Sequence, residues 1–275
     1  MQIVTEPSEA RQALASLPRP LGFVPTMGAL HEGHLALLRQ ARRRDTSVAA
    51  SIFVNPMQFG QGEDFERYPR AVEGDRRHCE AAGVDVLFVP SPKAMYPADF
   101  STSVDAGALG DAYEGAIRPE HFRGVATIVV KLLHVIGPDA LYLGQKDAQQ
   151  TAVLRRVVRD LNFPIAVEIV ETVREADGLA LSSRNAYLNE RERAAAPTLH
   201  RALVALRDAL QEGAPKEAAI ARAHQTLDPS AKADYFDVVD ALTFTPIDPL
   251  RPEAFVIGAA RFGTTRLIDN LWIRT

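Results

Sequence analysis

The sequence predicts an α/β protein built on a parallel sheet and followed by a smaller α+β part. Short apolar runs alternate with segments of helical periodicity up to Val170, and this spacing is typical of βαβ units. Beyond that point, helical tracts precede three alternating or apolar runs, the last two joined by a Gly-containing link that favours a hairpin turn. We therefore expect two domains, at residues 1–174 and 175–275.

The elements of the first domain follow from apolar runs and their boundaries. Apolar runs that end in Pro, Gly or polar residues predict strands at 2–4, 21–24, 47–54, 84–89, 140–143 and 165–170. Helical periodicity predicts a helix that starts near Pro7 and stops before Pro18, and others at 33–44, 71–82, 126–136 and 147–161. Residues 93–124 are rich in Pro and Gly and are expected to form a long loop, which in a compact domain is usually functional.

The second domain is expected to begin with a polar loop at residues 178–185. A helical tract at 189–211 and a helix at 216–227 follow. Strands are expected at 235–239, 254–260 and 265–271, with a hairpin turn in the link 261–266. The sequence contains no internal repeat.

The composition is that of a soluble globular enzyme. The chain has 275 residues, of which 47% are hydrophobic and 24% are charged. Its net charge of -4 provides no overall attraction to nucleic acid or to an anionic membrane, so neither partner is expected. The single cysteine, Cys79, is interpreted as structural and suits a reducing compartment. With no signal pattern and no apolar run of membrane length, we expect a cytoplasmic protein.

The segment PTMGALHEGH, residues 25–34, is the most informative part of the sequence. It leaves a buried strand and opens a helix, whose first N–H groups and positive dipole end favour phosphate. His31 and His34 could each donate a hydrogen bond to a phosphate oxygen. The pair could instead be a helix cap or a surface polar pair. A zinc site is less favoured, because the histidines are separated by two residues and not by the three of zinc proteases.

Polar loops also follow other predicted strands, at residues 55–60, 144–150 and 173–184. The carboxyl ends of parallel strands form the usual ligand site of such a sheet. Each loop has a simpler interpretation: Lys146 and Asp147 could form an ion pair at a helix start, and 182–184 could be an ordinary turn. Neither a P-loop nor a dinucleotide fingerprint is present. Together the loops favour a nucleotide site suited to attack at the α-phosphorus, with pyrophosphate leaving.

Six segments together resemble the pantothenate synthetases, also called pantoate–β-alanine ligases, over the whole chain. The resemblance implies a Rossmann-like nucleotidyltransferase domain of the HIGH type, a smaller C-terminal lid domain and a homodimer. It also implies that ATP and pantoate give pantoyl adenylate and pyrophosphate, after which the β-alanine amine displaces AMP to give pantothenate. The segments are PTMGALHEGH (25–34), SIFVNPMQFG (51–60), DFERYPR (64–70), HFRGV (121–125), GQKDAQQ (144–150) and DGLALSSRN (177–185).

The resemblance also assigns site residues. His34 is the implied proton donor, and Gln58 and Gln150 are implied to hold the pantoate hydroxyls and carboxylate. Lys146 is implied to reach the phosphates, Val173 to contact adenine, and the loop from Leu181 to close over the phosphates. The implied ATP contacts are Met27, Gly28, Ala29, Leu30, His31, Glu32, Gly33, His34, Gly144, Gln145, Lys146, Asp147, Val173, Leu181, Ser182, Ser183 and Arg184, and those with a catalytic part are His31, His34, Lys146, Ser182, Ser183 and Arg184.

Other assignments from the resemblance are looser. Asn55, Tyr68 and Arg123 are placed on the substrate side, and Mg²⁺ is implied by ATP chemistry, with Asp75 as a possible ligand. Two other functions stay open. One is a nucleotidyltransferase that adds AMP or CMP to a phosphorylated acceptor, and the other is a non-catalytic nucleotide-binding sensor or subunit.

Overall fold

The computed structural model describes residues 1–60, 62–63, 65–248 and 251–273. The chain divides into two compact units, one made of Met1–Gly144 with Gln149–Val170 and the other of Gln145–Ala148 with Glu171–Thr275. The expected functional domains, 1–174 and 175–275, stay a prediction.

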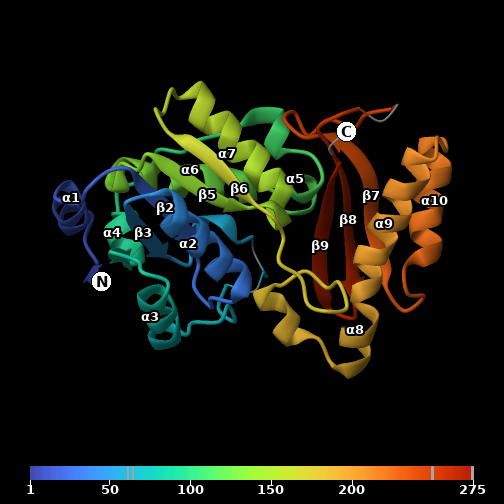
Figure 1. The fold of residues 1–275 in the computed structure, drawn as a ribbon, viewed down its shortest axis with the longest axis horizontal. Helices are drawn as coiled ribbons and strands as arrows, with labels where there is room; N and C mark the ends of the chain where they lie inside the picture. Colours follow the sequence, from blue (N-terminus) through green and yellow to red (C-terminus); the bar gives the residue numbers. More distant parts are fainter. Residues whose placement is uncertain (61, 64, 249–250, 274–275) are drawn as a thin grey trace. The chain divides into compact units, whose positions relative to one another are not determined.

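The first unit contains a six-stranded parallel sheet in the order β1-β4-β3-β2-β5-β6, which confirms the predicted α/β fold (Figure 1). From β2 the chain adds β3 and β4 on one side and then returns to add β5 on the other, so the strand order reverses between β2 and β5. In such sheets ligands bind at this reversal, beyond the carboxyl ends of the strands. The strands are β1 (Gln2–Val4), β2 (Leu21–Thr26), β3 (Ser47–Ile52), β4 (Val86–Phe88), β5 (Ala140–Gly144) and β6 (Ala166–Val170).

Both faces of this sheet are covered by helices. Successive strand residues point to opposite faces, and accordingly Phe23 belongs to one buried cluster and Val24 to another. All six residues of β3 are buried, as expected for a strand with helices on both sides. Helices α1 (Pro7–Ala15), α6 (His121–Ile136) and α7 (Ala148–Asp160) contribute to the first cluster, and α2 (Glu32–Arg44) and α3 (Val72–Ala81) to the second.

Residues 93–124 are more ordered than a loop. They contain three short helical segments, α4 (Pro92–Met95), η2 (Gly107–Gly110) and α5 (Glu114–Ile117), and α6 begins at His121 and not at 126. The predicted start of that helix was wrong because Gly124 was treated as part of the loop. Gly124 is instead a helical residue whose missing side chain allows another backbone segment to approach.

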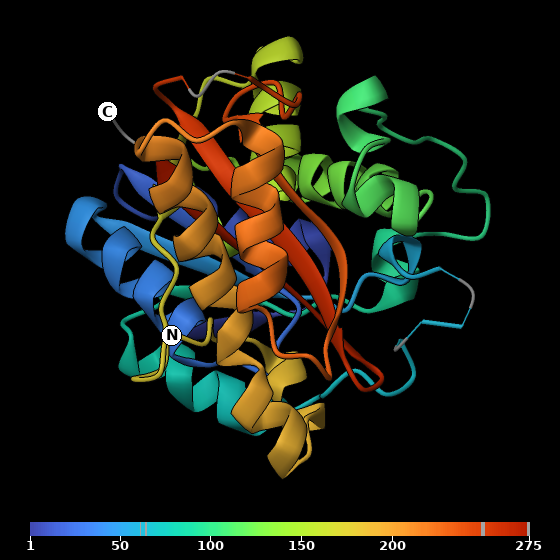
Figure 2. The same ribbon diagram turned by 90° about the vertical axis from the view of Figure 1, so that its right-hand side faces the viewer.

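The second unit contains a three-stranded antiparallel sheet, β7 (Lys232–Asp240), β8 (Ala254–Phe262) and β9 (Thr265–Ile273). Figure 2 shows α9 (Pro197–Gln211) and α10 (Lys216–Thr226) lying over it. The hairpin predicted between β8 and β9 is confirmed. The helical tract predicted at 189–211 is divided into α8 (Glu190–Ala195) and α9, because Pro197 lacks an N–H and starts a new helix.

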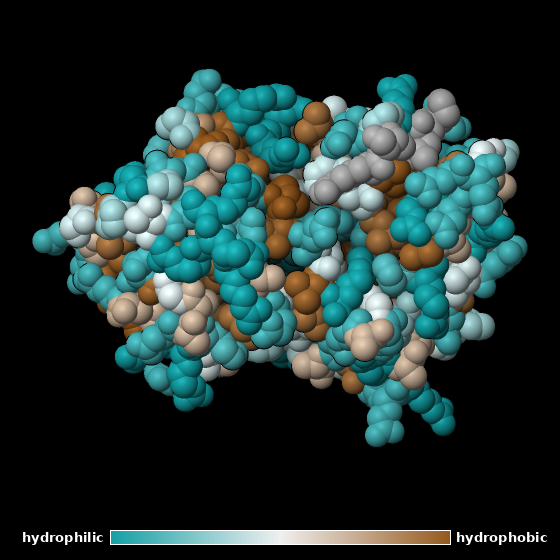
Figure 3. Space-filling view, viewed as in Figure 1, coloured by the Kyte–Doolittle hydropathy of each residue, from teal (hydrophilic) through white to brown (hydrophobic). Residues whose placement is uncertain are grey.

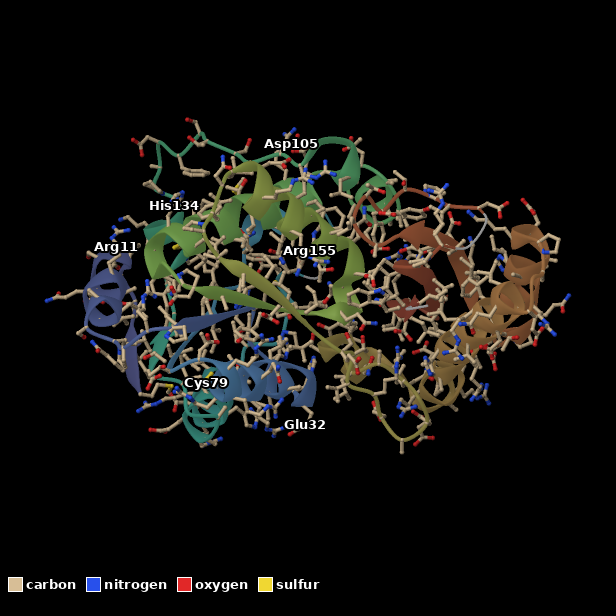
Figure 4. All side chains as sticks on the ribbon, turned by 45° about the horizontal axis from the view of Figure 1, so that its top comes forward. Arg11, Glu32, Cys79, Asp105, His134 and Arg155 are labelled. Carbon is tan, nitrogen blue, oxygen red and sulfur yellow. The ribbon has the colours of Figure 1, made fainter. Side chains whose placement is uncertain are left out.

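Polar side chains cover most of the face shown in Figure 3. None of the helices in the described residues has the length and apolar composition needed to cross a membrane. Cys79, labelled in Figure 4, is buried on α3, and burial followed by the nearby Asp75 carboxylate raises the pKa of its thiol to about 12. A thiol so protected from ionisation suits the expected structural role.

Candidate active site

The loop after β2 is held by a buried carboxylate. Gly28 and Ala29 have positive φ angles of 87° and 51°, and the amides of Ala29 and Leu30 donate to the two oxygens of Asp75 at 2.8 and 2.7 Å. A Cβ on Gly28 would lie 2.9 Å from Asp75 Oδ2. The loop can therefore take this shape only with glycine at position 28 and an acceptor at position 75. Asp75 has a positioning role that the sequence did not reveal.

His31 and His34 form a capping box at the start of α2. The Nδ1 of His31 accepts from the Gly33 amide at 3.2 Å, and the Nδ1 of His34 accepts from the His31 amide at 3.3 Å. The helix cap considered from the sequence is therefore present. A neutral imidazole that accepts at Nδ1 carries its proton on Nε2. When neutral, both rings thus have the tautomer in which Nε2–H is the donor, so capping and phosphate binding are compatible. The two ring centroids are 4.2 Å apart.

Glu32, between the two histidines, has a different environment. It is exposed at the first turn of α2 (Figure 4), and Arg39 donates to its carboxylate at 2.9 Å. The Arg39 hydrogen bond holds the pKa of Glu32 below its ordinary value. Glu32 therefore pairs with a residue of its own helix, and its contact with ATP stays a prediction.

Gln58 lies in η1 (Pro56–Gln58), which follows β3, and it links two loops. Its Nε2 donates to the sulfur of Met27 at 2.9 Å, while its Oε1 accepts from Asn55 Nδ2 at 3.1 Å. Asn55 also donates to the Gly124 carbonyl and accepts from the Met57 amide and the Tyr96 hydroxyl. Two donors and two acceptor positions of Asn55 are used, and one of these contacts positions Gln58, so a direct substrate role for Asn55 stays a prediction.

The backbone carbonyl of Gln58 is held by two residues that the sequence did not indicate. His121 Nδ1 lies 2.7 Å from this oxygen, and Arg118 Nη2 donates to it at 3.1 Å. Arg118 also donates through Nε to Glu63 at 2.9 Å. The guanidinium lies 3.2 Å from His121 Nε2, which can only accept, so Nδ1 carries the proton and donates to Gln58. Only the position of Arg118 and His121 just before and within the segment HFRGV was visible in the sequence.

Stability should depend on pH through His121. Burial, followed by the Arg118 charge, lowers its pKa from an ordinary value of about 6.5 to about 4 in the folded protein. The unfolded chain therefore binds this proton at higher pH than the folded chain, and folding free energy is lost as the pH falls from about 6.5 toward 4. The loss from this group is at most about 3 kcal/mol.

Urea unfolding of the wild type and of His121→Gln across that pH range measures this effect. Glutamine keeps a donor for the Gln58 carbonyl and does not titrate, so the variant should lose less stability than the wild type on acidification. Equal losses in the two proteins would show that His121 is not the titrating group.

Other residues on the expected substrate side have partners of their own. Arg123 is exposed and forms ion pairs with Asp105 and Glu120 at 3.1 and 2.6 Å. Tyr68 is buried and packs edge-on against Phe59, with ring centroids 5.9 Å apart. The substrate roles of both stay predictions, and Asp64, in the same segment as Tyr68, lies outside the described residues.

Gln150 lies in the first turn of α7 and is partly exposed. The residue before it, Gln149, is buried: its Nε2 donates to the carbonyls of Leu109 and Ala112, and its Oε1 accepts from the Glu114 amide. Gln149 therefore ties the segment before α6 to the start of α7. No pattern in the sequence distinguishes this structural glutamine from Gln150.

In the second unit, Lys146 lies in η3 (Gln145–Asp147), and its Nζ is 3.6 Å from Asp147 Oδ1. The ion pair considered from the sequence is present. Lys146 and Ser182 line one cavity together with Asn185, His200 and Asp269. Ser182 caps η4 (Ser183–Tyr187) by accepting from the Arg184 amide at 3.3 Å, and Leu181 donates to the Val173 carbonyl at 3.0 Å. The structure thus brings Lys146 close to the loop that ends in Ser182–Arg184.

In the part of the chain that the structure describes, no group of three or more His, Cys, Asp or Glu side chains could hold a metal ion. Asp75 directs its oxygens at two backbone amides. The described side chains therefore do not form a Mg²⁺ site by themselves, and Asp75 as a ligand stays a prediction.

The reversal of strand order, the polar loops at the strand ends and the capped histidine pair define a Rossmann-like α/β enzyme. Residues 2–272 match the family described as Pantoate-beta-alanine ligase. A pantothenate synthetase of Chloroflexus aggregans is 51% identical over 277 residues, which cover 99% of each chain. The chain therefore belongs to the pantoate–β-alanine ligase family, and it is a ligase.

Solved structures agree with this assignment. The crystal structure of pantothenate synthetase from Thermus thermophilus is 48% identical, covers 100% of both chains and has a TM-score of 0.95. A pantoate-beta-alanine ligase from Francisella tularensis, complexed with beta-gamma ATP and beta-alanine, is 33% identical, covers 99% of this chain and 97% of its own, and has a TM-score of 0.82.

Proposed function

We propose that the chain joins pantoate to β-alanine through a pantoyl adenylate formed from ATP. Family membership and the likeness to a ligase complexed with an ATP compound and β-alanine support this proposal. The single observation that carries it is the His31–His34 capping box at the reversal of strand order. Because Nδ1 of each histidine accepts from a backbone amide, a neutral imidazole here carries its proton on Nε2, the group from which a phosphate oxygen could accept.

In this proposal, two groups of residues bind the phosphates. His34 donates through Nε2–H to the α-phosphate, and His31 supports it at the neighbouring oxygens. Lys146 neutralises phosphate charge, and the loop from Leu181 to Arg184 closes over the phosphates. These contacts would stabilise the charge that builds on the α-phosphoryl group and on the leaving pyrophosphate, which is the main task in such a transfer.

Pantoate specificity falls to Gln58 and Gln150. Among the described residues, Gln58 uses one N–H and one oxygen lone pair within the protein. An amide has a second N–H and a second lone pair, so Gln58 can still donate to a carboxylate and accept from a hydroxyl. Asn55 holds the side-chain oxygen of Gln58, and Arg118 and His121 hold its backbone carbonyl, so little conformational entropy is lost when pantoate binds.

The chemistry needs no nucleophile from the protein. A pantoate carboxylate oxygen bonds to the α-phosphorus while the bond from that phosphorus to pyrophosphate breaks. The β-alanine amine then bonds to the acyl carbon, the bond from that carbon to AMP breaks, and the amine proton is lost. The protein binds, orients and neutralises charge, which lowers both barriers without a covalent enzyme intermediate.

Mg²⁺, a homodimer and a cytoplasmic location remain proposals that rest on the resemblance. Mg²⁺ usually keeps several waters and binds through one or two carboxylates together with substrate phosphates. A site completed by ATP is therefore consistent with the absence of a three-residue ligand set among the described side chains.

Isotope exchange tests the proposed reaction directly. Pantoate should support exchange between ATP and labelled pyrophosphate without β-alanine, and AMP should appear only when β-alanine is added. Exchange that depends on a phosphorylated acceptor would indicate a nucleotidyltransferase. ATP binding with neither exchange nor AMP would indicate a non-catalytic nucleotide-binding protein.

A further inference from the structure

Two consecutive residues near the end of the chain, Asp269 and Asn270 on β9, are buried polar side chains in the second unit. Their exposed fractions are 4% and 2%. A polar group buried this deeply is costly unless it is fully hydrogen-bonded. The hydrogen-bond partners of these two side chains therefore indicate what the residues do in the fold.

Asn270 binds the segment that carries Lys146. Its Nδ2 donates to the carbonyls of Gln145 and Lys146, both at 2.9 Å, and its Oδ1 accepts from the Gln145 side chain at 3.1 Å. Both N–H groups and one lone pair of a single amide are used on two successive residues. This fixes the orientation of two peptide groups, and with it the direction in which the Lys146 side chain leaves the backbone.

Asp269 binds the segment that leads to Ser182. Arg174 donates to it bidentately at 2.6 and 2.9 Å, and Arg174 also donates to the Gly178 carbonyl at 3.1 Å. Although burial raises the pKa of Asp269, the His200 and Arg174 side chains outweigh it and hold the carboxyl ionised. The turn that leads to Ser182 is therefore anchored by a charged pair, the strongest type of hydrogen bond available to it.

We propose that Asp269 and Asn270 are positioning residues for the phosphate-handling groups, Asn270 for Lys146 and Asp269 for the loop that ends in Ser182–Arg184. Adjacent residues of a strand have a fixed spacing and point to opposite faces, so Asn270 can hold the Lys146 segment while Asp269 holds the loop, and the strand sets their separation. The shared cavity lined by Lys146, Ser182 and Asp269 is where this separation matters. The inference rests on the proposed role of Lys146 at the phosphates.

The first test compares Asn270→Ala with Thr198→Ala in the full chain. Thr198 is 6% exposed in the same unit, donates to the Ala195 carbonyl and accepts from the Asp228 amide. Its two hydrogen bonds, against three for Asn270, make it a comparison for the loss of a buried polar side chain. Both variants should unfold at a lower temperature. Only Asn270→Ala should lower kcat of pantoate-dependent pyrophosphate exchange, by about tenfold or more, as expected for a displaced catalytic group.

Asn270→Ser supplies one hydroxyl that can donate to a carbonyl, so it should recover part of the rate. This variant also keeps the test informative if Asn270→Ala fails to fold. If Asn270→Ala and Thr198→Ala slow exchange equally, the role of Asn270 is only structural and the inference is wrong.

A double variant separates this inference from the proposed function. If Asn270 acts through Lys146, the double variant Lys146→Ala, Asn270→Ala should be within about twofold of Lys146→Ala alone, because interacting residues are not additive. A multiplicative loss would overturn the inference and leave the role of Lys146 intact. Normal exchange by Lys146→Ala would instead remove the proposed role of Lys146, and this inference with it.

Discussion

His34→Ala should slow adenylate formation far more than it weakens ATP binding. The Nε2–H of His34 is proposed to donate to an oxygen whose negative charge grows in the transition state, and removal of one such donor typically costs about 100-fold or more in rate. In the ground state the same contact is an ordinary hydrogen bond, so ATP affinity should fall by roughly 2- to 10-fold. Single-turnover formation of pantoyl adenylate and equilibrium ATP binding measure the two quantities separately.

The substitution also removes part of a capping box, and this effect needs a control. In α1, Glu9 holds the equivalent position and accepts from the Glu6 amide at 3.2 Å. Glu9→Ala should therefore lose a similar stability, about 1 kcal/mol, without slowing the reaction. If His34→Ala reduced the rate and the affinity by the same factor, its role in the transition state would be excluded.

Gly124→Ala should be strongly destabilising, although the same change inside a helix normally stabilises. A Cβ on Gly124 would lie 2.2 Å from the Met57 carbonyl oxygen and 2.7 Å from the Gln58 amide nitrogen. Both atoms belong to the backbone and cannot rotate away, so η1 must move. We expect a loss of about 1–3 kcal/mol in the free energy of unfolding and a raised KM for pantoate, since Gln58 moves with η1.

Gly74→Ala is the matched control for this prediction. Gly74 lies in α3, and a Cβ there would meet no atom within 4 Å. Alanine should then stabilise the protein by about 0.5–1 kcal/mol through its helix propensity. The free energy of unfolding, measured in urea, should therefore fall in Gly124→Ala and rise in Gly74→Ala. The KM for pantoate should rise more in Gly124→Ala than in Gly74→Ala. If Gly124→Ala were as stable as Gly74→Ala, the close approach of η1 to α6 would not be required for stability.

The sequence determined the sheet and the segments that follow its strands. Buried strands and amphipathic helices have different periods, and this difference is local, so the order of strands and helices in the first unit could be predicted. The same local rules failed at Gly124 and at Pro197. Gly124 was taken for part of a loop, and its helical position depends on the backbone that packs beside it. Pro197 was passed over within a tract, although its missing N–H starts a new helix.

The tertiary structure alone decided which polar residues hold the site in place. Asp75 binds the amide of Leu30 across 45 residues, and Asn270 binds the Gln145 carbonyl across 125. A buried Asp or Asn has the same appearance in sequence as an exposed one, because burial and hydrogen-bond partners depend on how distant segments meet. The sequence could therefore indicate His31, His34, Gln58 and Lys146 only as candidates for substrate contact. The residues that position them became visible only from the folded chain.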